Sequence, residues 1–264
     1  MVINGIYQRK KEKDRIFSGK LLAFIKVVLL CMVIGMGIVA CGNSGQQGSL
    51  SISVNGEKVS QEEYLQIMKE RKFFVERYFA DSFQADISEK GFWEGSFGGE
   101  NPCQRLIDDT ISTLLTQRAM YSLAEERGYI EDGSYQGILE RLEKENTLRA
   151  AKIERGEVVY GLTSFSLAQW MDYEEGILQE TFCNDLENKE MQLTDEERNE
   201  FLGTEEWEDQ DGIPGITVEE LGVGFDQELR KAKYANLIEQ RAEEAELLID
   251  EDAVYKFTLQ NLTG

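Results

Sequence analysis

The sequence predicts a mainly α-helical protein with one small β element. Apolar side chains recur at helical spacing in several long segments of the chain. Only two prolines, Pro102 and Pro214, occur among 264 residues, so few segments are barred from a helix. Two short apolar segments, at 50–54 and 247–249, are typical of strands, and we expect these N- and C-terminal strands to pair.

The first elements are a β-hairpin followed by a helix. Segment 50–54 alternates apolar and polar side chains and ends at the turn dipeptide Asn55-Gly56, and a second strand is expected at 57–59. Ser60 and Glu63 have the spacing of a capping box, which predicts a helix start. The apolar face of this helix contains Tyr64, Ile67, Met68, Phe74, Val75 and Tyr78.

Segment 81–102 is rich in glycine and aromatic residues and predicts a loop with a short helix. A second long helix is expected at 104–127, because apolar residues recur at helical spacing and Gly128 is a suitable C-terminal stop. A third helix is expected at 134–155, where Gly156 ends the pattern.

The C-terminal half predicts further helices. One begins after Ser164 and continues to about Leu186, and a capping box at 194–197 opens a short helix that ends near Leu202. The acidic, glycine-rich segment 203–224 predicts a loop or hairpin. The last long helix is expected at 227–246, then the strand at 247–249 and a final short element at 254–259.

The N-terminus has the features of a bacterial lipoprotein signal. The run Ile38-Val39-Ala40-Cys41 ends an apolar stretch that follows a basic segment and precedes a segment rich in Gly, Ser and Gln. We therefore expect a signal peptide at 1–40, a lipid on Cys41, a flexible tether at 41–49 and a helical domain at 50–264. The alternative is that the N-terminal segment stays uncleaved as an anchor helix. Both the lipid anchor and the anchor helix would place the domain outside the cytoplasm at the cell membrane.

Composition excludes several function classes. The formal net charge is −22, and removal of residues 1–40, which hold seven basic and two acidic residues, leaves −27. Such an acidic surface repels nucleic acid and favours cationic partners. The chain contains no histidine, which excludes histidine-based nucleophile triads and metal sites. We predict no catalytic residue, metal site or cofactor, and the acidic run 205–211 lacks the spacing of an EF-hand loop.

Two cysteines, Cys103 and Cys183, lie in the predicted domain. In an oxidising compartment they could form a disulfide, and they could equally be two buried free thiols. The sequence leaves both alternatives open.

Three motifs, in this order, resemble a known family. The segments 53–64 (SVNGEKVSQEEY), 193–197 (LTDEE) and 242–249 (AEEAELLI) are similar to the opening, middle and closing segments of the SurA N-terminal and PrsA-like chaperone domains. PrsA-like proteins usually hold a parvulin prolyl isomerase domain between the helix that opens at the second motif and the closing helix. Here only 203–226 occupies that interval, which is too short to build a core, and the histidines of parvulin sites are absent. The resemblance implies a chaperone body without its isomerase.

The predicted function is therefore a lipid-anchored extracytoplasmic chaperone that binds unfolded or nascent secreted proteins without catalysis. The alternatives are a PrsA-like protein with residual isomerase activity, and a solute-binding or adhesion lipoprotein. Aromatic residues that cluster where the helical periodicity is lost are the predicted client contacts: Phe73, Phe79, Phe83, Phe92, Trp93 and Phe97.

Overall fold

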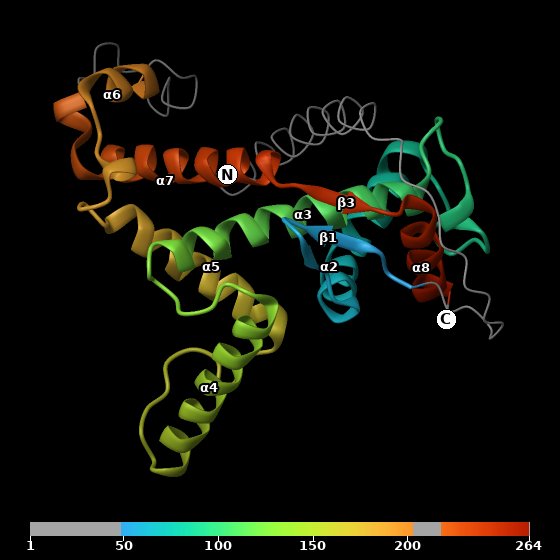
Figure 1. The fold of residues 1–264 in the computed structure, drawn as a ribbon, viewed down its shortest axis with the longest axis horizontal. Helices are drawn as coiled ribbons and strands as arrows, with labels where there is room; N and C mark the ends of the chain where they lie inside the picture. Colours follow the sequence, from blue (N-terminus) through green and yellow to red (C-terminus); the bar gives the residue numbers. More distant parts are fainter. Residues whose placement is uncertain (1–48, 203–217, 264) are drawn as a thin grey trace. The chain divides into compact units, whose positions relative to one another are not determined.

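The computed structural model describes residues 49–202 and 218–263, and they form two compact units (Figure 1). Unit 1 contains residues up to 115 and from 245 onward, and unit 2 contains residues 116–244, so the boundary falls within helix α3 (Pro102–Glu126). The described residues form seven α-helices, α2 to α8, and one three-stranded antiparallel sheet. The predicted fold class is confirmed.

The sheet of unit 1 joins the two ends of the domain. Strand β1 (Ile52–Val54) lies between β2 (Glu57–Lys58) and β3 (Leu247–Ile249), and both pairings are antiparallel. Asn55 and Gly56 form the hairpin turn with φ angles of 52° and 81°, the left-handed conformation that this turn requires. The predicted pairing of N- and C-terminal strands is confirmed, with Ile52 opposite Ile249.

Helix α2 (Gln61–Phe83) begins where the sequence predicts. The Ser60 hydroxyl accepts a hydrogen bond from the Glu63 amide at 3.1 Å and satisfies one free donor of the first turn. The segment after α2 contains the short 3₁₀-helix η1 (Phe92–Glu94), as expected for a loop with a short helix. Gly98 has a φ of 61°, and a Cβ there would lie 2.3 Å from the Phe83 ring, so the turn requires glycine.

Helix α8 (Glu251–Thr263) corrects the sequence-based expectation of a short element at 254–259. Asp250 accepts a hydrogen bond from the Ala253 amide at 3.0 Å and caps the helix. Val254 and Thr258 lie in the core of unit 1, where the Thr258 hydroxyl is 2.7 Å from the Tyr64 hydroxyl. The segment extends because its buried face follows the helical period.

A half-buried carboxyl on α3 makes the stability of unit 1 depend on pH. Burial raises the pKa of Asp108 to about 6, and the nearby Asp109 and Glu251 carboxylates act in the same direction, while Gln104 and Arg105 oppose them. Because the folded state holds this proton more tightly than the unfolded chain, Asp108 destabilises the fold above pH 6. That penalty is relieved as the pH falls toward the ordinary carboxyl pKa of about 4.

We therefore expect Asp108→Asn to raise the free energy of unfolding at pH 7.5 by about 1 to 2 kcal/mol, allowing for partial exposure of the site. At pH 4.5 the variant and the original chain should differ little. Urea denaturation at both pH values measures the difference between the two proteins, which removes the contribution of all other carboxyls. An equal effect at both pH values would contradict the assignment.

Unit 2 contains the remaining helices: the C-terminal part of α3, α4 (Tyr135–Glu154), α5 (Leu167–Asn184), the 3₁₀-helix η2 (Lys189–Met191), α6 (Asp195–Leu202) and α7 (Val218–Glu244). Ser134 caps α4, and Ser166 and Gln169 form a capping box at α5. The predicted capping box of α6 is also present, because Thr194 and Glu197 exchange side-chain-to-backbone hydrogen bonds of 3.1 and 2.8 Å.

Helix α7 starts at Val218, earlier than the predicted Gln227. Tertiary contacts stabilise this start: Phe225 is buried, and Asp226 accepts hydrogen bonds from the Arg198 guanidinium at 2.9 and 3.1 Å. The glycines at 222 and 224 lower the local helix propensity and conceal the start in the sequence. Most of the predicted loop at 203–224 lies outside the described residues, as do the signal segment and Cys41.

Both described cysteines are buried free thiols, which decides between the two alternatives for Cys103 and Cys183. Burial raises the pKa of the Cys103 thiol to about 12 and also raises that of Cys183, so both are protonated at neutral pH. A search for membrane-spanning helices over the described ranges finds none that is both long and apolar enough.

Candidate functional site

A helical hairpin in unit 2 carries the most exposed apolar side chains of the described chain. The hairpin consists of α4, the loop 155–166 and the start of α5, and in Figure 1 α4 and the loop lie at the opposite end of unit 2 from α6. Four apolar side chains near the turn, here called the hairpin tip, are exposed: Ile153, Val158, Tyr160 and Leu162. The exposed fractions of Val158 and Tyr160 are 72% and 86%. Clustered exposed apolar residues mark interaction sites more often than isolated ones do.

The loop begins at a glycine that ends α4. Gly156 has a φ of 71°, its amide donates to the Ile153 carbonyl at 2.9 Å, and the Glu157 amide donates to the Lys152 carbonyl at 2.9 Å. These bonds satisfy the last carbonyls of the helix and turn the chain back toward α5. The predicted stop at Gly156 is confirmed.

Arg149 on α4 fixes the conformation of the loop. Its guanidinium donates hydrogen bonds to the backbone carbonyls of Tyr160 at 3.1 Å and Leu162 at 2.5 Å, and to the Glu145 carboxylate at 2.7 Å. The same group lies 4.5 Å from the centre of the Phe165 ring. The charge is satisfied by the protein itself, so the loop is held with its apolar side chains directed to solvent.

Asn146, one turn earlier on α4, holds the far end of the loop. Its amide donates to the Phe165 carbonyl at 2.9 Å and its side-chain oxygen accepts from the Phe165 amide at 2.7 Å. The Phe165 ring stacks on Tyr173 of α5 with centroids 5.0 Å apart. The hairpin tip is therefore a preorganised surface, which lowers the entropic cost of binding.

We expect Arg149→Ala to loosen this loop without unfolding unit 2. The variant loses three hydrogen bonds made by one charged group, so opening of residues 157–163 should become easier by about 2 kcal/mol. Amide hydrogen exchange measures this as faster exchange confined to the loop. Arg155→Ala is the matched control, because Arg155 lies on the same hairpin and its guanidinium pairs with the exposed Glu157 carboxylate. Equal exchange in both variants would contradict the role of Arg149.

The hairpin tip has no net charge although the chain is strongly acidic, because the charges of Lys152, Glu154, Arg155 and Glu157 around it sum to zero. No Asp, Glu, Lys or Arg occurs from Val158 to Met171, and Arg155 and Glu157 neutralise each other at 2.6 Å. Below the tip, Arg141 and the buried Glu174 form an ion pair of 2.6 Å that joins α4 to α5. The neutral surface is suited to binding apolar polypeptide segments. An apolar segment that covered a charged surface would remove its charges from water, which costs free energy.

The six aromatic residues predicted from the sequence lie in unit 1, not at the hairpin tip. Phe79, Phe92 and Trp93 are buried, and Phe83 and Phe97 are half-buried. Phe79 is central in this cluster, since its ring centroid lies 5.5 to 5.9 Å from those of Phe83, Phe92 and Phe97. Phe73 is 60% exposed beside exposed Phe74. Contact of this group with a client stays a prediction, and in this conformation Phe73 is the accessible member.

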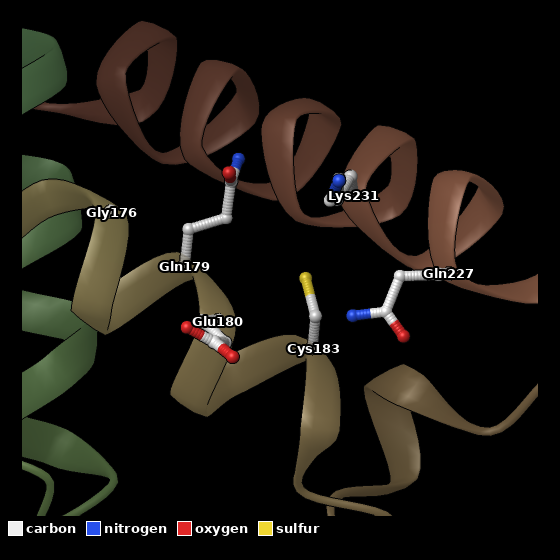
Figure 2. A pocket seen from close by; sticks show the side chains of 6 residues that line it. All are labelled: Gly176, Gln179, Glu180, Cys183, Gln227 and Lys231. Carbon is white, nitrogen blue, oxygen red and sulfur yellow. The ribbon is translucent and has the colours of Figure 1, made fainter. Parts of the chain in front are cut away.

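A polar cavity of about 270 Å³ lies between parts of α5 and α7, which contact each other elsewhere (Figure 2). Four of its lining residues come from α5 and two from α7: Gly176, Gln179, Glu180, Cys183, Gln227 and Lys231. In Figure 2 the Cys183 sulfur points into the space between the helices. Its thiol is protonated, and the chain has no histidine to act as a base. Among the described residues no group of three His, Cys, Asp or Glu side chains could hold a metal ion.

Comparison with known proteins gives one informative relative. A protein of Bifidobacterium longum subsp. longum named "Chaperone for lacto-N-biosidase" is 30% identical over 206 residues, which cover 77% of this chain and 73% of that protein. The chain belongs to the family of this chaperone. No family model matches the sequence, and no solved structure matches the fold. The SurA and PrsA-like relationship stays a resemblance of sequence motifs.

Membership in a chaperone family gives the exposed surfaces a functional meaning, because a chaperone binds a client protein. The hairpin tip was missed by sequence reasoning, which followed aromatic density. One feature of the sequence does indicate the hairpin tip. The stretch from Val158 to Met171 has no charged residue, although 30% of the chain is charged, and it follows closely after the helix stop at Gly156.

Proposed function

We propose that this member of the chaperone family holds unfolded secreted polypeptide at the hairpin tip, outside the cytoplasm and without covalent chemistry. The observation that carries the proposal is the exposure of Val158 and Tyr160 on a loop that Arg149 and Asn146 hold in place. An apolar client segment that covers these side chains removes their surface from water at about 25 cal/mol per Å². The binding is driven by the hydrophobic effect and is reversible.

The acidic remainder of the chain supports this role in two ways. A net charge of −22 keeps copies of the chaperone apart while their apolar tips are exposed. It also attracts the basic segments of a client and raises the rate of encounter. The neutral tip then makes contact with apolar segments.

The relative suggests the kind of client. Its name states that it is a chaperone for lacto-N-biosidase. We propose that the client of this chain is likewise a secreted enzyme of that kind.

The lipoprotein signal that ends at Ile38-Val39-Ala40-Cys41 supports tethering at the membrane. A lipid on Cys41, with removal of residues 1–40, would leave the tether 41–49 between the bilayer and β1. An extended segment of this length reaches roughly 30 Å, which keeps the chaperone where secreted chains emerge. Replacement of Cys41 by serine tests the anchor, because the protein should move from the membrane fraction to the soluble fraction and lose labelling by radioactive palmitate.

An aggregation assay tests the chaperone proposal. The full chain, at an amount close to stoichiometric, should suppress the aggregation of a reduced, unfolded secreted protein. The same preparation should not accelerate a proline-limited refolding reaction at catalytic amounts, since the interval 203–226 is too short for a parvulin domain and the sequence has no histidine. Absence of suppression would contradict the holding function, and catalytic acceleration would support the isomerase alternative.

A further inference from the structure

The two edge strands of the sheet in unit 1 differ in charge, and only β2 has charged side chains. Edge strand β2 consists of Glu57 and Lys58, whose charges protect it against pairing with another chain. The opposite edge strand, β3, is Leu247-Leu248-Ile249 and has neither charge nor proline. The Leu248 side chain is 52% exposed, and Leu247 and Ile249 are partly exposed. This edge lacks the usual protection.

The register shows which backbone groups of β3 face outward. The Asn55 amide donates to the Glu246 carbonyl at 2.8 Å, and the Asp250 amide donates to the Ser51 carbonyl at 3.0 Å. Along an antiparallel ladder every second residue of a strand is hydrogen-bonded to its neighbour strand. Leu248 lies two residues from both Glu246 and Asp250, so it also directs its amide and carbonyl toward β1. Leu247 and Ile249 therefore direct theirs away from the sheet.

These outward groups have no partner in the described part of the chain. Two amides and two carbonyls, spaced as on a strand, form a row of donors and acceptors that an extended polypeptide satisfies. We propose that β3 binds an extended segment of the client as a fourth strand. The proposal rests on the chaperone function above and adds a second, backbone-directed binding site in unit 1.

Charge selects the kind of segment that fits. Exposed carboxylates lie at both ends of β3, with Glu246 before it and Asp250, Glu251 and Asp252 after it. A second copy of β3 in this position would place like charges opposite one another, which is unfavourable. The fitting partner has an apolar strand-forming centre with lysine or arginine at its ends. Charged residues commonly flank strand segments that are prone to aggregate, so such client segments are suitable targets.

Peptide binding to the full chain, purified in a mild detergent, tests this inference. The probe is a short peptide of alternating valine and threonine with lysines at both ends. It should slow hydrogen exchange at the amides of Leu247 and Ile249 and leave that of Leu248, which already faces β1, unchanged. Two control peptides should bind at least about tenfold more weakly by fluorescence anisotropy: one with glutamates in place of the lysines, and one with N-methylated alternate amides.

Two variants separate the edge from the rest of the molecule. Ile249→Pro removes one outward amide, which an edge strand tolerates, and should weaken the peptide about tenfold. Glu246→Lys leaves the backbone intact. It should lower the affinity for the lysine-flanked peptide and raise the affinity for the glutamate-flanked peptide. An unfolded variant would lose affinity for both peptides, so this result separates the two cases. A Leu186→Ser variant, changed at an exposed side chain of unit 2 outside the hairpin tip, should bind the peptide normally.

The outcomes distinguish the edge from the chaperone function. If the peptide binds without protecting Leu247 and Ile249, or does not bind, the edge inference is wrong, while aggregation assays on the hairpin tip still decide the holding function. If both amides are already protected in concentrated protein that sediments as a dimer, a second copy occupies the edge and the inference is also wrong.

Discussion

Replacement of both Val158 and Tyr160 by serine is expected to remove most of the client-holding activity. The two side chains are the most exposed apolar groups of the hairpin tip, and each loses its apolar surface in the variant. Burial of such side chains contributes about 1.5 to 3 kcal/mol each, so loss of the pair should weaken client binding roughly 100-fold or more. Light scattering of an aggregating client at near-stoichiometric chaperone measures the effect.

The control for this variant is Leu186→Ser. Leu186 is 61% exposed, lies in unit 2 and follows the opposite end of α5 from the tip. Neither change removes a core contact, so both proteins should keep the free energy of unfolding within about 0.5 kcal/mol. If loss of Leu186 impairs holding as much as loss of the tip residues, general surface hydrophobicity and not the hairpin tip accounts for the activity.

Phe79→Ala is expected to be the most destabilising single change in unit 1. Phe79 is fully buried and its ring contacts those of Phe83, Phe92 and Phe97. Truncation leaves a cavity inside an aromatic cluster and should cost about 3 to 5 kcal/mol, a large fraction of the stability of an ordinary domain. Urea denaturation followed by tryptophan fluorescence, with Trp170 and Trp207 replaced by phenylalanine in both proteins so that Trp93 alone emits, reports on this cluster.

Phe73→Ala is the matched control, since Phe73 lies on the same helix but is exposed. It should change stability by no more than about 0.5 kcal/mol. If it also impairs client holding, the predicted role of Phe73 as a client contact is supported. Equal destabilisation by the two alanine variants would contradict the buried position of Phe79.

The parts of the fold that the sequence predicts correctly depend on local rules. Ser60, Gly128 and Gly156 mark helix ends because capping and left-handed backbone geometry involve residues close in sequence. The turn at Asn55-Gly56 follows from the same kind of rule, and it places β1 so that it can pair with β3.

The parts that escape prediction depend on distant residues. The start of α7 is stabilised by Arg198 of α6, which bonds to Asp226 across the unit. The conformation of the tip depends on Arg149, whose hydrogen bonds to two loop carbonyls cannot be inferred from composition. Aromatic density identifies buried rings such as Phe79 and Phe92 equally well as binding residues, so it does not separate core from surface.

A photo-crosslinking amino acid at position 160 tests the central claim most directly. The chaperone with the probe in place of Tyr160 is illuminated while it prevents the aggregation of an unfolded secreted enzyme. We expect a covalent adduct with the unfolded client that disappears when the client is folded, and little adduct from the same probe at position 186. Adducts of equal yield at both positions, or none at position 160 while aggregation is still suppressed, would contradict a client site at the hairpin tip.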